Sequence, residues 1–238
     1  MCWNCANNCQ ECASLFWWCE MCGRFAAYNR KSINELLDEL GVGIVESQFT
    51  ARYNVSPSAS INVVINRQKP VVADMSWGLQ AEWMKAKGMH ALINARAETI
   101  HEKTSFKNLI IHSRAVIPVN GFYEWRRENT EKHCYYFEPC KHQALALGAI
   151  YQQTRGGEMQ ACIITTPANA VMAPVHDRMP VILAADSMRE WLTTDNQARV
   201  DALMQPCPDD WIRTVEVSSY VNSSRNEGVK CITALHAG

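Results

Sequence analysis

The sequence predicts an α+β fold: a single domain built on a mostly antiparallel twisted sheet, or an open barrel, with helices at its periphery. Short apolar runs rich in β-branched residues recur along the chain, few segments show helical periodicity, and neither a repeat nor a linker divides it. Short strands with few helices between them favour an antiparallel sheet over alternating β–α units. At 238 residues with 47% apolar content, the chain can bury one substantial core.

The first helix is expected at Ser32–Leu40. Ser32 and Glu35 have the spacing of a capping box, in which each side chain satisfies a backbone N–H of the first turn. Gly41 can adopt the left-handed conformation that ends a helix. One face of the segment is apolar, as an amphipathic helix requires. The residues of this face are Ile33, Leu36, Leu37 and Leu40.

Two further helices are expected near the C-terminus. The first begins at a second capping box, Ser187 with Glu190. Its apolar face consists of Met188, Trp191 and Leu192. The next helix is expected to be capped by Asp195 and to run to about Gln205, because two prolines follow.

Strands are expected wherever apolar runs are continuous or alternate with polar residues. The first two runs are separated by the polar segment Arg67–Pro70, which predicts a β-hairpin. In chain order, the expected strands lie near Ile61–Asn66, Val71–Trp77, Arg114–Val119, Cys134–Glu138, Ala144–Ile150, Gln160–Thr166, Pro180–Leu183 and Arg213–Val217.

Cysteine divides the chain into two parts. Six of the 11 cysteines lie within the first 22 residues, and the other five are scattered, as reduced thiols of a cytosolic protein are. The six form Cys-x-x-Cys pairs, a spacing that can bind Zn²⁺ or an iron–sulfur cluster. No glycine occurs among residues 1–22 to shape a metal-binding knuckle. We therefore favour the interpretation that residues 1–20 are a leader or a mis-assigned start, and that the domain comprises residues 21–238.

Composition excludes several classes of protein. The first 20 residues contain neither Lys nor Arg, and the apolar run Ala13–Cys19 is too short for a signal peptide or a membrane span. A cytoplasmic protein, or a nuclear one in a eukaryote, is therefore expected, with no membrane partner. The formal net charge is −1; without Glu11 and Glu20 the acidic residues fall from 24 to 22, against 23 basic ones. A polyanion must therefore bind to a local basic patch.

Polar clusters interrupt the apolar pattern where a core does not need them. Four are the most distinctive: Met21–Phe25, Leu92–Thr99, Asn120–Trp125 and Val175–Pro180. They are accompanied by Arg52–Pro57, Trp77–Gly78, Val221–Asn222 and Asn226–Gly228. In this order and spacing, the set resembles the SRAP family, the SOS-response-associated peptidase or abasic-site-processing proteins, over essentially Met21–Leu235. The resemblance implies the SRAP fold and a monomer that binds single-stranded DNA without a cofactor or metal.

The resemblance also implies that Cys22 becomes the first residue of the mature chain. An N-terminal cysteine carries an α-amine with a pKa of about 7.7–8.0 beside a thiol with a pKa of about 8.5, so both are expected to supply nucleophile at neutral pH. The amine would form a Schiff base with the aldehyde of an abasic site, and the thiolate would then close a thiazolidine. With residues 1–20 attached, the Cys22 nitrogen is an amide and cannot react in this way.

Three more residues match reactive positions of the family. Glu124, between aromatic neighbours that can raise a carboxyl pKa, would protonate the sugar ring oxygen. His176 would assist proton transfer and stabilise the Schiff base, while Asn94 would orient Cys22 or the sugar. The structural alternatives are a surface carboxylate for Glu124, a core histidine bonded to Asp177, and a turn-forming role for Asn94.

By the same resemblance, six residues are expected to contact DNA: Arg24, Arg96, Arg178, Trp77, Trp125 and Pro57. The arginines would hold phosphates, and the tryptophans would stack on bases or act as a wedge at a single-strand/duplex junction. The alternatives are ion pairs with Glu98 and Asp177 for the arginines, and core positions for the tryptophans. The chain departs from the family at Leu79–Trp83, where a proline-containing loop is common and Glu82 would repel phosphate.

Two other functions stay open. Cys22, Asn94 and His176 are also the residue types of a thiol hydrolase. Its natural substrate would be the peptide bond before Cys22, so that the protein would release its own N-terminal extension. The third function is a metal-binding regulatory head attached to a non-catalytic DNA-binding module.

Overall fold

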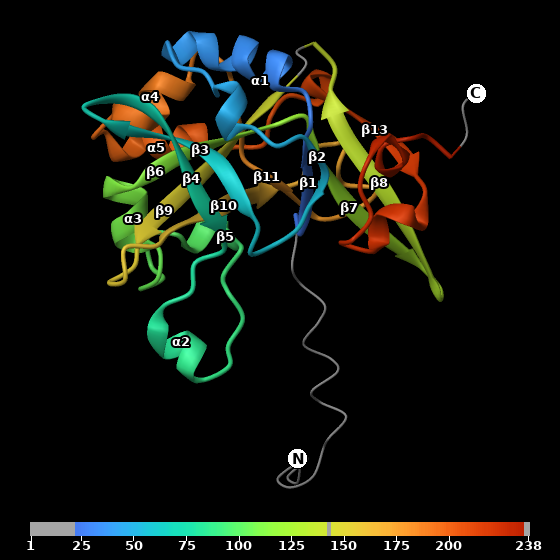
Figure 1. Cartoon of the computed structure of the whole chain (residues 1–238), viewed down its shortest axis with the longest axis horizontal. Coiled ribbons are helices and arrows are strands. Elements are labelled where there is room, and N and C mark those ends of the chain that lie inside the picture. Colours follow the sequence, from blue (N-terminus) through green and yellow to red (C-terminus); the bar gives the residue numbers. More distant parts are fainter. Residues whose placement is uncertain (1–21, 142–143, 236–238) are drawn as a thin grey trace, which may run out of the picture.

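Two β-sheets form the centre of the structure, and most of the helices lie around the larger sheet (Figure 1). The computed structural model describes residues 22–141 and 144–235. The N-terminal extension 1–20, expected to be a leader or a mis-assigned start, lies outside the described residues. Within them, no helix is long and apolar enough to cross a membrane. The arrangement confirms the predicted α+β fold with mostly antiparallel strands and peripheral helices.

The smaller sheet contains the first described strand. Its order is β13-β8-β7-β1-β2, and every neighbouring pair is antiparallel. The strands are β1 (Arg24–Ala27), β2 (Arg52–Val55), β7 (Gly121–Glu128), β8 (Glu131–Pro139) and β13 (Ile212–Val217). The sequence predicted β8 and β13 but missed the other three. The polar motif residues on β1, β2 and β7 interrupt the apolar runs by which a strand is recognised.

The larger sheet contains the predicted hairpin. Its strands are β3 (Ser60–Arg67), β4 (Lys69–Trp77), β5 (Asn94–Arg96), β6 (Arg114–Val119), β9 (Leu145–Gln153), β10 (Met159–Pro167), β11 (Arg178–Pro180) and β12 (Ile182–Leu183). β3 and β4 pair as far as Arg67↔Lys69, so the turn is Gln68 alone, at φ 66°, rather than four residues. β10 runs parallel to β4 and β5. β9 pairs with both β6 and β10, so the sheet curls back on itself.

The helices of the described residues are short. They are α1 (Arg30–Leu37), α2 (Glu82–Ala86), α3 (Lys107–His112), α4 (Met188–Thr193) and α5 (Gln197–Leu203). α1 continues into the 3₁₀ turn Asp38–Leu40, which ends at Gly41 in the left-handed conformation, φ 69°, as predicted. α2 and α3 were not predicted, because segments of five or six residues show little helical periodicity and neither begins with the capping-box pattern that predicted α4.

Asparagine caps α1 and α5 in place of the predicted serine and aspartate. The Asn29 side chain accepts from the Ser32 N–H at 3.2 Å before α1, and Asn196 accepts from the Arg199 N–H at 3.3 Å before α5. Ser187 makes no side-chain cap before α4. The reason is conformational: both asparagines are extended, which lets the side chain reach the first turn, whereas Ser187 is already helical, at φ −86° and ψ −12°.

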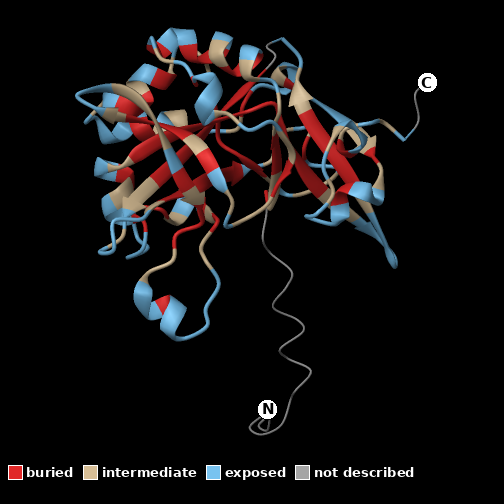
Figure 2. Cartoon of the chain, in the orientation of Figure 1, coloured by how far each residue is buried: buried red, intermediate tan, exposed pale blue. Residues whose placement is uncertain are grey.

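Alternate side chains of the larger sheet fill two cores. On β3, Val63 and Ile65 face a core that they share with residues of the smaller sheet such as Phe25, whereas Val64 faces the core under the helices. This period of two is the geometry of a strand, and Figure 2 shows buried residues concentrated in the strands. Cys22 belongs to the core between the sheets, so the candidate site includes part of that core.

The substitution Gly121→Ala tests the close packing of β7 on β8. A Cβ at Gly121 would lie 2.4 Å from the Phe137 carbonyl oxygen and 2.5 Å from the Tyr136 ring, so the two strands must move apart. We expect the free energy of unfolding, measured by urea denaturation, to fall by about 3 kcal/mol. The control is Gly156→Ala, where the nearest atom to the added Cβ is Thr154 Oγ1 at 3.8 Å. It should change stability by less than about 0.5 kcal/mol, and equal losses would contradict this packing.

Candidate active site

Strand pairing brings Cys22 beside Glu124. β1 pairs with β7 in the register Arg24↔Tyr123, so Cys22, two residues before β1 begins, lies beside the continuation of β7. The backbone N–H of Cys22 donates to Glu124 Oε2 at 2.9 Å, and Glu124 Oε1 accepts from the Trp125 N–H at 3.1 Å. Cys22 is fully buried and Glu124 is 5% exposed. Two backbone amides therefore hold the carboxyl group in one orientation, and the surface alternative for Glu124 is wrong.

Burial sets the proton affinity of both groups. It raises the pKa of Glu124 above its ordinary value. The two backbone hydrogen bonds and the charges of His176 and Lys132 lower this pKa, but their effect is smaller than that of burial. Burial also raises the pKa of the Cys22 thiol well above its ordinary value, and the Glu124 charge adds to this effect. This corrects the expectation that the thiol supplies nucleophile at neutral pH as readily as a free cysteine: desolvation favours the protonated thiol, so its reaction needs a base.

His176 lies on the segment that leads into β11, and its charge acts on Glu124. The Nδ1 atom is 2.8 Å from Asp177 Oδ1 and 3.1 Å from the backbone nitrogen of Arg178. A protonated Nδ1 donates to Asp177, and an unprotonated Nδ1 accepts from the Arg178 N–H. The ring nitrogen therefore has a hydrogen-bond partner whether or not it carries a proton. The predicted contact with Asp177 is present, and His176 also acts on Glu124 through its charge.

Asn94 begins β5, which runs parallel to β10 and pairs there with Ile163. The residue is half-buried, and the preceding Ile93 belongs to the same core as Cys22. Because Asn94 lies in a strand, the turn-forming alternative is wrong. Its predicted role, to orient Cys22 or the sugar, stays a prediction.

Two of the predicted arginines act on Glu98: Arg178 forms an ion pair with it, and Arg96 acts through its charge. Arg178 donates through both Nη atoms to the two oxygens of Glu98, each at 2.8 Å, and also to the Thr165 carbonyl at 2.9 Å. This contact holds the pKa of Glu98 below its usual range, and the charge of the exposed Arg96 adds to the effect. The ion-pair alternative therefore describes Arg178, whose charge Glu98 already compensates.

Arg24 has a different environment. Its half-buried guanidinium donates through Nη1 to two neutral acceptors, Asn54 Oδ1 at 2.7 Å and the Val221 carbonyl at 3.1 Å. None of the ion pairs in the described part of the chain includes Arg24, and its buried Nε has no hydrogen-bond partner there. Burial lowers the pKa of Arg24. A partly desolvated cation without a counter-ion is suited to bind an anion such as phosphate.

The two predicted tryptophans also differ. Trp77 is 0% exposed and donates its Nε1–H to the Ile93 carbonyl at 3.2 Å. It has no face on which a base could stack, so the expectation of DNA contact is wrong and Trp77 is a core residue. Trp125 is half-buried and donates its Nε1–H to Asn222 Oδ1 at 2.7 Å. Lys132 Nζ lies 4.6 Å from the centre of the Trp125 ring.

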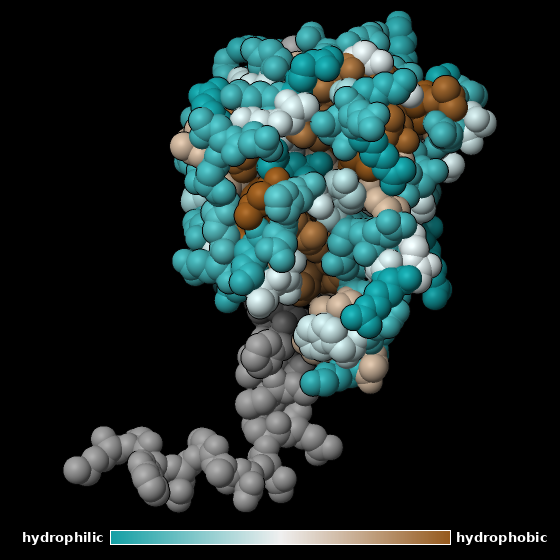
Figure 3. Space-filling model, turned by 90° about the vertical axis from the view of Figure 1, so that its left-hand side faces the viewer, coloured by the Kyte–Doolittle hydropathy of each residue, from teal (hydrophilic) through white to brown (hydrophobic). Residues whose placement is uncertain are grey.

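Trp83 is a candidate that the sequence reasoning missed. It is 56% exposed on α2, and Lys87 Nζ lies 5.8 Å from its ring centre. The segment that carries α2 projects from the body of the molecule (Figures 1 and 3). The available signal was a tryptophan placed where the chain departs from the family pattern. Pro57, which the sequence did predict, is half-buried in the turn that follows β2.

The described residues offer no group of three His, Cys, Asp or Glu side chains that could hold a metal ion. The metal-binding alternative concerns the N-terminal Cys-x-x-Cys pairs. Of their six cysteines, all but Cys22 lie outside the part of the chain that the structure describes.

Comparisons with known proteins give a family, relatives and a solved structure that the chain resembles. The model of the SOS response associated peptidase (SRAP) family matches residues 21–224. The chain is 34% identical to the abasic site processing protein YoaM of Bacillus subtilis over 90% of this chain and 98% of that protein. It is 29% identical to the abasic site processing protein YedK of Escherichia coli over 89% and 99%. A crystal structure of a protein from Bacteroides thetaiotaomicron has the same fold, with a TM-score of 0.79 at 22% identity over 90% of this chain and 100% of that chain.

The substitution Glu124→Gln tests the raised pKa, because glutamine keeps an oxygen for the Cys22 N–H but does not titrate. The folded-state pKa of Glu124 lies above the ordinary value of 4.5. The tighter proton binding of the folded state contributes stability that is fully present below pH 4.5 and is lost as the pH rises through the folded-state pKa.

We therefore expect the free energy of unfolding of the wild type, relative to Glu124→Gln, to fall as the pH rises from acid toward neutrality. Urea denaturation of both proteins at a series of pH values measures this difference. A difference that stays constant or increases over that range would contradict the raised pKa.

Proposed function

The chain belongs to the SOS-response-associated peptidase (SRAP) family, and on this premise we propose that it captures abasic sites in single-stranded DNA as a covalent adduct through Cys22. Relatives named abasic site processing proteins support abasic DNA as the substrate. The observation that carries the proposal is the 2.9 Å hydrogen bond from the Cys22 nitrogen to Glu124. It joins the candidate nucleophile to a carboxyl group whose pKa is raised by burial.

The first step uses the nitrogen of Cys22. Once the preceding residues are removed, this nitrogen is an α-amine, whose ordinary pKa is about 7.7–8.0. Glu124 donates a proton to the ring oxygen of the sugar and takes back the proton of the anomeric hydroxyl, so the ring opens to the aldehyde and Glu124 is protonated again. The neutral amine adds to the aldehyde carbon, Glu124 donates the proton that the departing hydroxyl needs, and water leaves, which gives a protonated Schiff base.

The second step uses the thiol of Cys22. Because burial keeps the thiol protonated, it reacts after the amine. Its proton passes to Glu124, which the first step left as a carboxylate, and the sulfur adds to the Schiff-base carbon. The new C–S bond closes a five-membered thiazolidine. Over both steps, one aldehyde and one aminothiol give one thiazolidine and one water, and Glu124 regains its starting protonation state.

His176 and Asn94 support these steps in the proposal. The positive charge of His176 favours the carboxylate form of Glu124, which is the form needed to accept the thiol proton. Asn94 orients Cys22 or the sugar through its amide.

The DNA is held by residues around this centre. Arg24 binds a phosphate that flanks the lesion, since its charge has no counter-ion among the described residues. Trp83 and Trp125 each combine an aromatic ring with a nearby lysine, the pairing of stacking and charge that binds single strands without sequence preference. Arg96 and Pro57 also contact the DNA in this proposal. The ion pair of Arg178 with Glu98 stabilises the surface on which they lie.

Protein that begins at Cys22 should form a heat-stable adduct with single-stranded DNA that contains an abasic site, visible as a slower band in denaturing electrophoresis. Cys22→Ala should form no stable adduct, because an alanine amine gives only a reversible Schiff base, which borohydride should trap. Protein that retains residues 1–21 should form none, because the Cys22 nitrogen is then an amide.

The control variant is Cys22→Ser, which replaces the thiol by a hydroxyl of similar size and keeps the amine. It should give far less stable adduct than the wild type. Equal yields of heat-stable adduct from Cys22→Ser and the wild type would exclude the thiazolidine.

A self-processing thiol peptidase is the second candidate function, and the same hydrogen bond favours it. In the full chain, the nitrogen that is hydrogen-bonded to Glu124 belongs to the Met21–Cys22 peptide bond. The Cys22 thiol would attack the Met21 carbonyl carbon, and the C–N bond would break as Glu124 protonates the nitrogen, which frees the Cys22 amine; the thiol proton would pass to Glu124 and restore its protonated form. Water would then hydrolyse the thioester, which releases residues 1–21 as a carboxylic acid and restores the thiol. This reaction would supply the terminus that the crosslink requires.

Intact mass after expression from residue 1 tests the self-processing function. The wild type should lose residues 1–21, whereas Cys22→Ala and Glu124→Ala should retain them in the same host, because one lacks the nucleophile and the other the acid. Thermal unfolding of both variants verifies that they are folded. Loss of the extension from Cys22→Ala would assign the cleavage to a host protease instead.

A further inference from the structure

We propose that Asn54 is a positioning residue for Arg24. Its side-chain amide holds the Arg24 guanidinium and the C-terminal segment, residues 221–227, in one arrangement that presents the Arg24 charge to a DNA phosphate. The inference deepens the proposed function and rests on it for the identity of the anion. It assigns a role in DNA affinity to a residue that is itself 0% exposed and cannot touch DNA.

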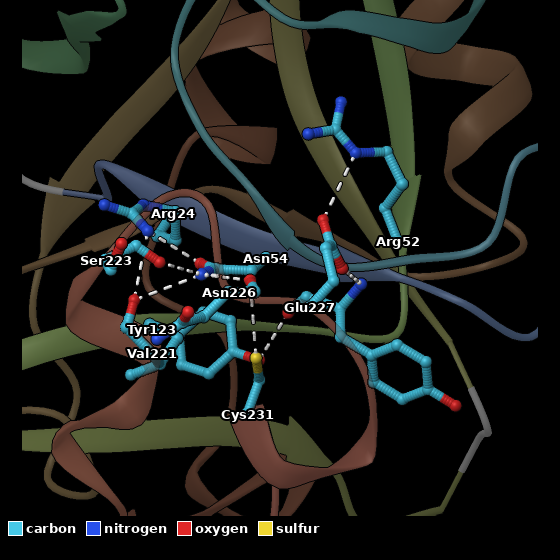
Figure 4. Close-up of polar contacts among 10 residues, drawn as sticks. Arg24, Arg52, Asn54, Tyr123, Val221, Ser223, Asn226, Glu227 and Cys231 are labelled. Carbon is cyan, nitrogen blue, oxygen red and sulfur yellow. Dashed lines mark hydrogen bonds and ion pairs between the residues drawn. The ribbon is translucent and has the colours of Figure 1, made fainter.

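The Asn54 amide contacts four groups (Figure 4). Its Nδ2 donates to three backbone carbonyls of the C-terminal segment: Val221 at 3.1 Å, Ser223 at 2.9 Å and Asn226 at 2.9 Å. Its Oδ1 accepts from Arg24 Nη1 at 2.7 Å. The carbonyls leave only one orientation for the amide, and that orientation turns the oxygen toward the arginine.

An amide is the side chain that this position requires. Aspartate cannot donate to the three carbonyls, because its carboxylate oxygens only accept hydrogen bonds. It would also place a negative charge beside Arg24. Serine is too short to reach both sides. Asparagine donates on one side and accepts on the other without a net charge, so it fixes the guanidinium without neutralising it.

The C-terminal segment holds two candidate DNA-contacting side chains through consecutive residues. The Val221 carbonyl accepts from Arg24 at 3.1 Å, and Asn222 Oδ1 accepts from the Trp125 indole at 2.7 Å. Arg24 Cζ lies 5.8 Å from the centre of the Trp125 ring. The cation and the aromatic ring are thus set side by side by one short stretch of backbone.

β2 holds this stretch at two points. Asn54 holds its carbonyls, and the next residue beyond them, Glu227, accepts from the Tyr53 N–H at 2.7 Å and from Arg52 Nε at 3.4 Å. The Glu227 contact fixes the far end of the segment without touching Arg24. The two attachments can therefore be separated by mutation.

The test is reversible binding of the full chain to undamaged oligothymidylate, followed by fluorescence anisotropy over a range of salt concentrations. Undamaged DNA excludes covalent capture, and log affinity falls with log salt with a slope of about 0.7 for each phosphate contact to a single strand. Arg24→Gln should reduce this slope by about 0.7. Asn54→Ser should reduce it equally, and the double variant should show no further loss, because Asn54 acts through Arg24.

Glu227→Gln is the matched control. It removes the charge that pairs with Arg52 but keeps an oxygen for the Tyr53 N–H, and it should leave the salt slope unchanged. If Asn54→Ser does not fold, Asn54→Gln replaces it; it keeps an uncharged amide but is one methylene too long to hold the carbonyls and Arg24 in the same arrangement, so the slope should again fall by about 0.7. The inference is overturned by a folded Asn54 variant with the wild-type slope, by a double variant that loses more than Arg24→Gln, or by an equal loss in Glu227→Gln.

A measurement without DNA separates this inference from the proposed function. In the wild type, the Nε–Hε NMR cross-peak of Arg24 should be sharp and slow to exchange with water, because the group is buried and the guanidinium is held. In Asn54→Ser the cross-peak should broaden or disappear, and its persistence would overturn the inference. If the wild type does not bind oligothymidylate, the proposed DNA-binding function fails, and the cross-peak alone decides the role of Asn54.

Discussion

The candidate site depends on the antiparallel pairing of β1 with β7. Their register places the nitrogen of Cys22 2.9 Å from the Glu124 carboxyl group. Because β1 lies between β7 and β2 in its sheet, it cannot shift without breaking hydrogen bonds on both sides. Cys22 itself has φ 50°, a conformation that is uncommon for residues other than glycine. The strand pairing and the bond to Glu124 together hold it there.

Burial and charge compensation then determine what each group at the site can do. An ion is costly to remove from water, so the buried Glu124 carboxyl and Cys22 thiol both favour their neutral forms. In the proposed mechanism, this favours an order of reaction in which the amine precedes the thiol. The same cost explains why Arg178 is paired with Glu98. Arg24 lies among neutral acceptors instead, and it keeps a charge that an anion can use.

The sequence predicted the elements whose residues follow a regular apolar pattern. The β3–β4 hairpin was found because both strands are apolar runs on either side of a polar turn, and α1 because its buried face repeats every three to four residues. β1, β2 and β7 were missed because polar residues such as Arg24, Asn54 and Glu124 interrupt their apolar runs. Helix caps were assigned to the wrong residues because capping depends on backbone conformation, which Ser187 and Asn29 do not reveal by type alone.

By itself, the sequence determined which motifs are present and, through their order, the family, and it predicted Cys22, Glu124 and His176 as site residues. Those signals are local, so they can be read along the chain. Only the tertiary structure decided which arginine is compensated, that Trp77 is buried, and that Asn54 supports Arg24. The physical reason is that these properties depend on partners from distant segments, and strand pairing brings those partners together.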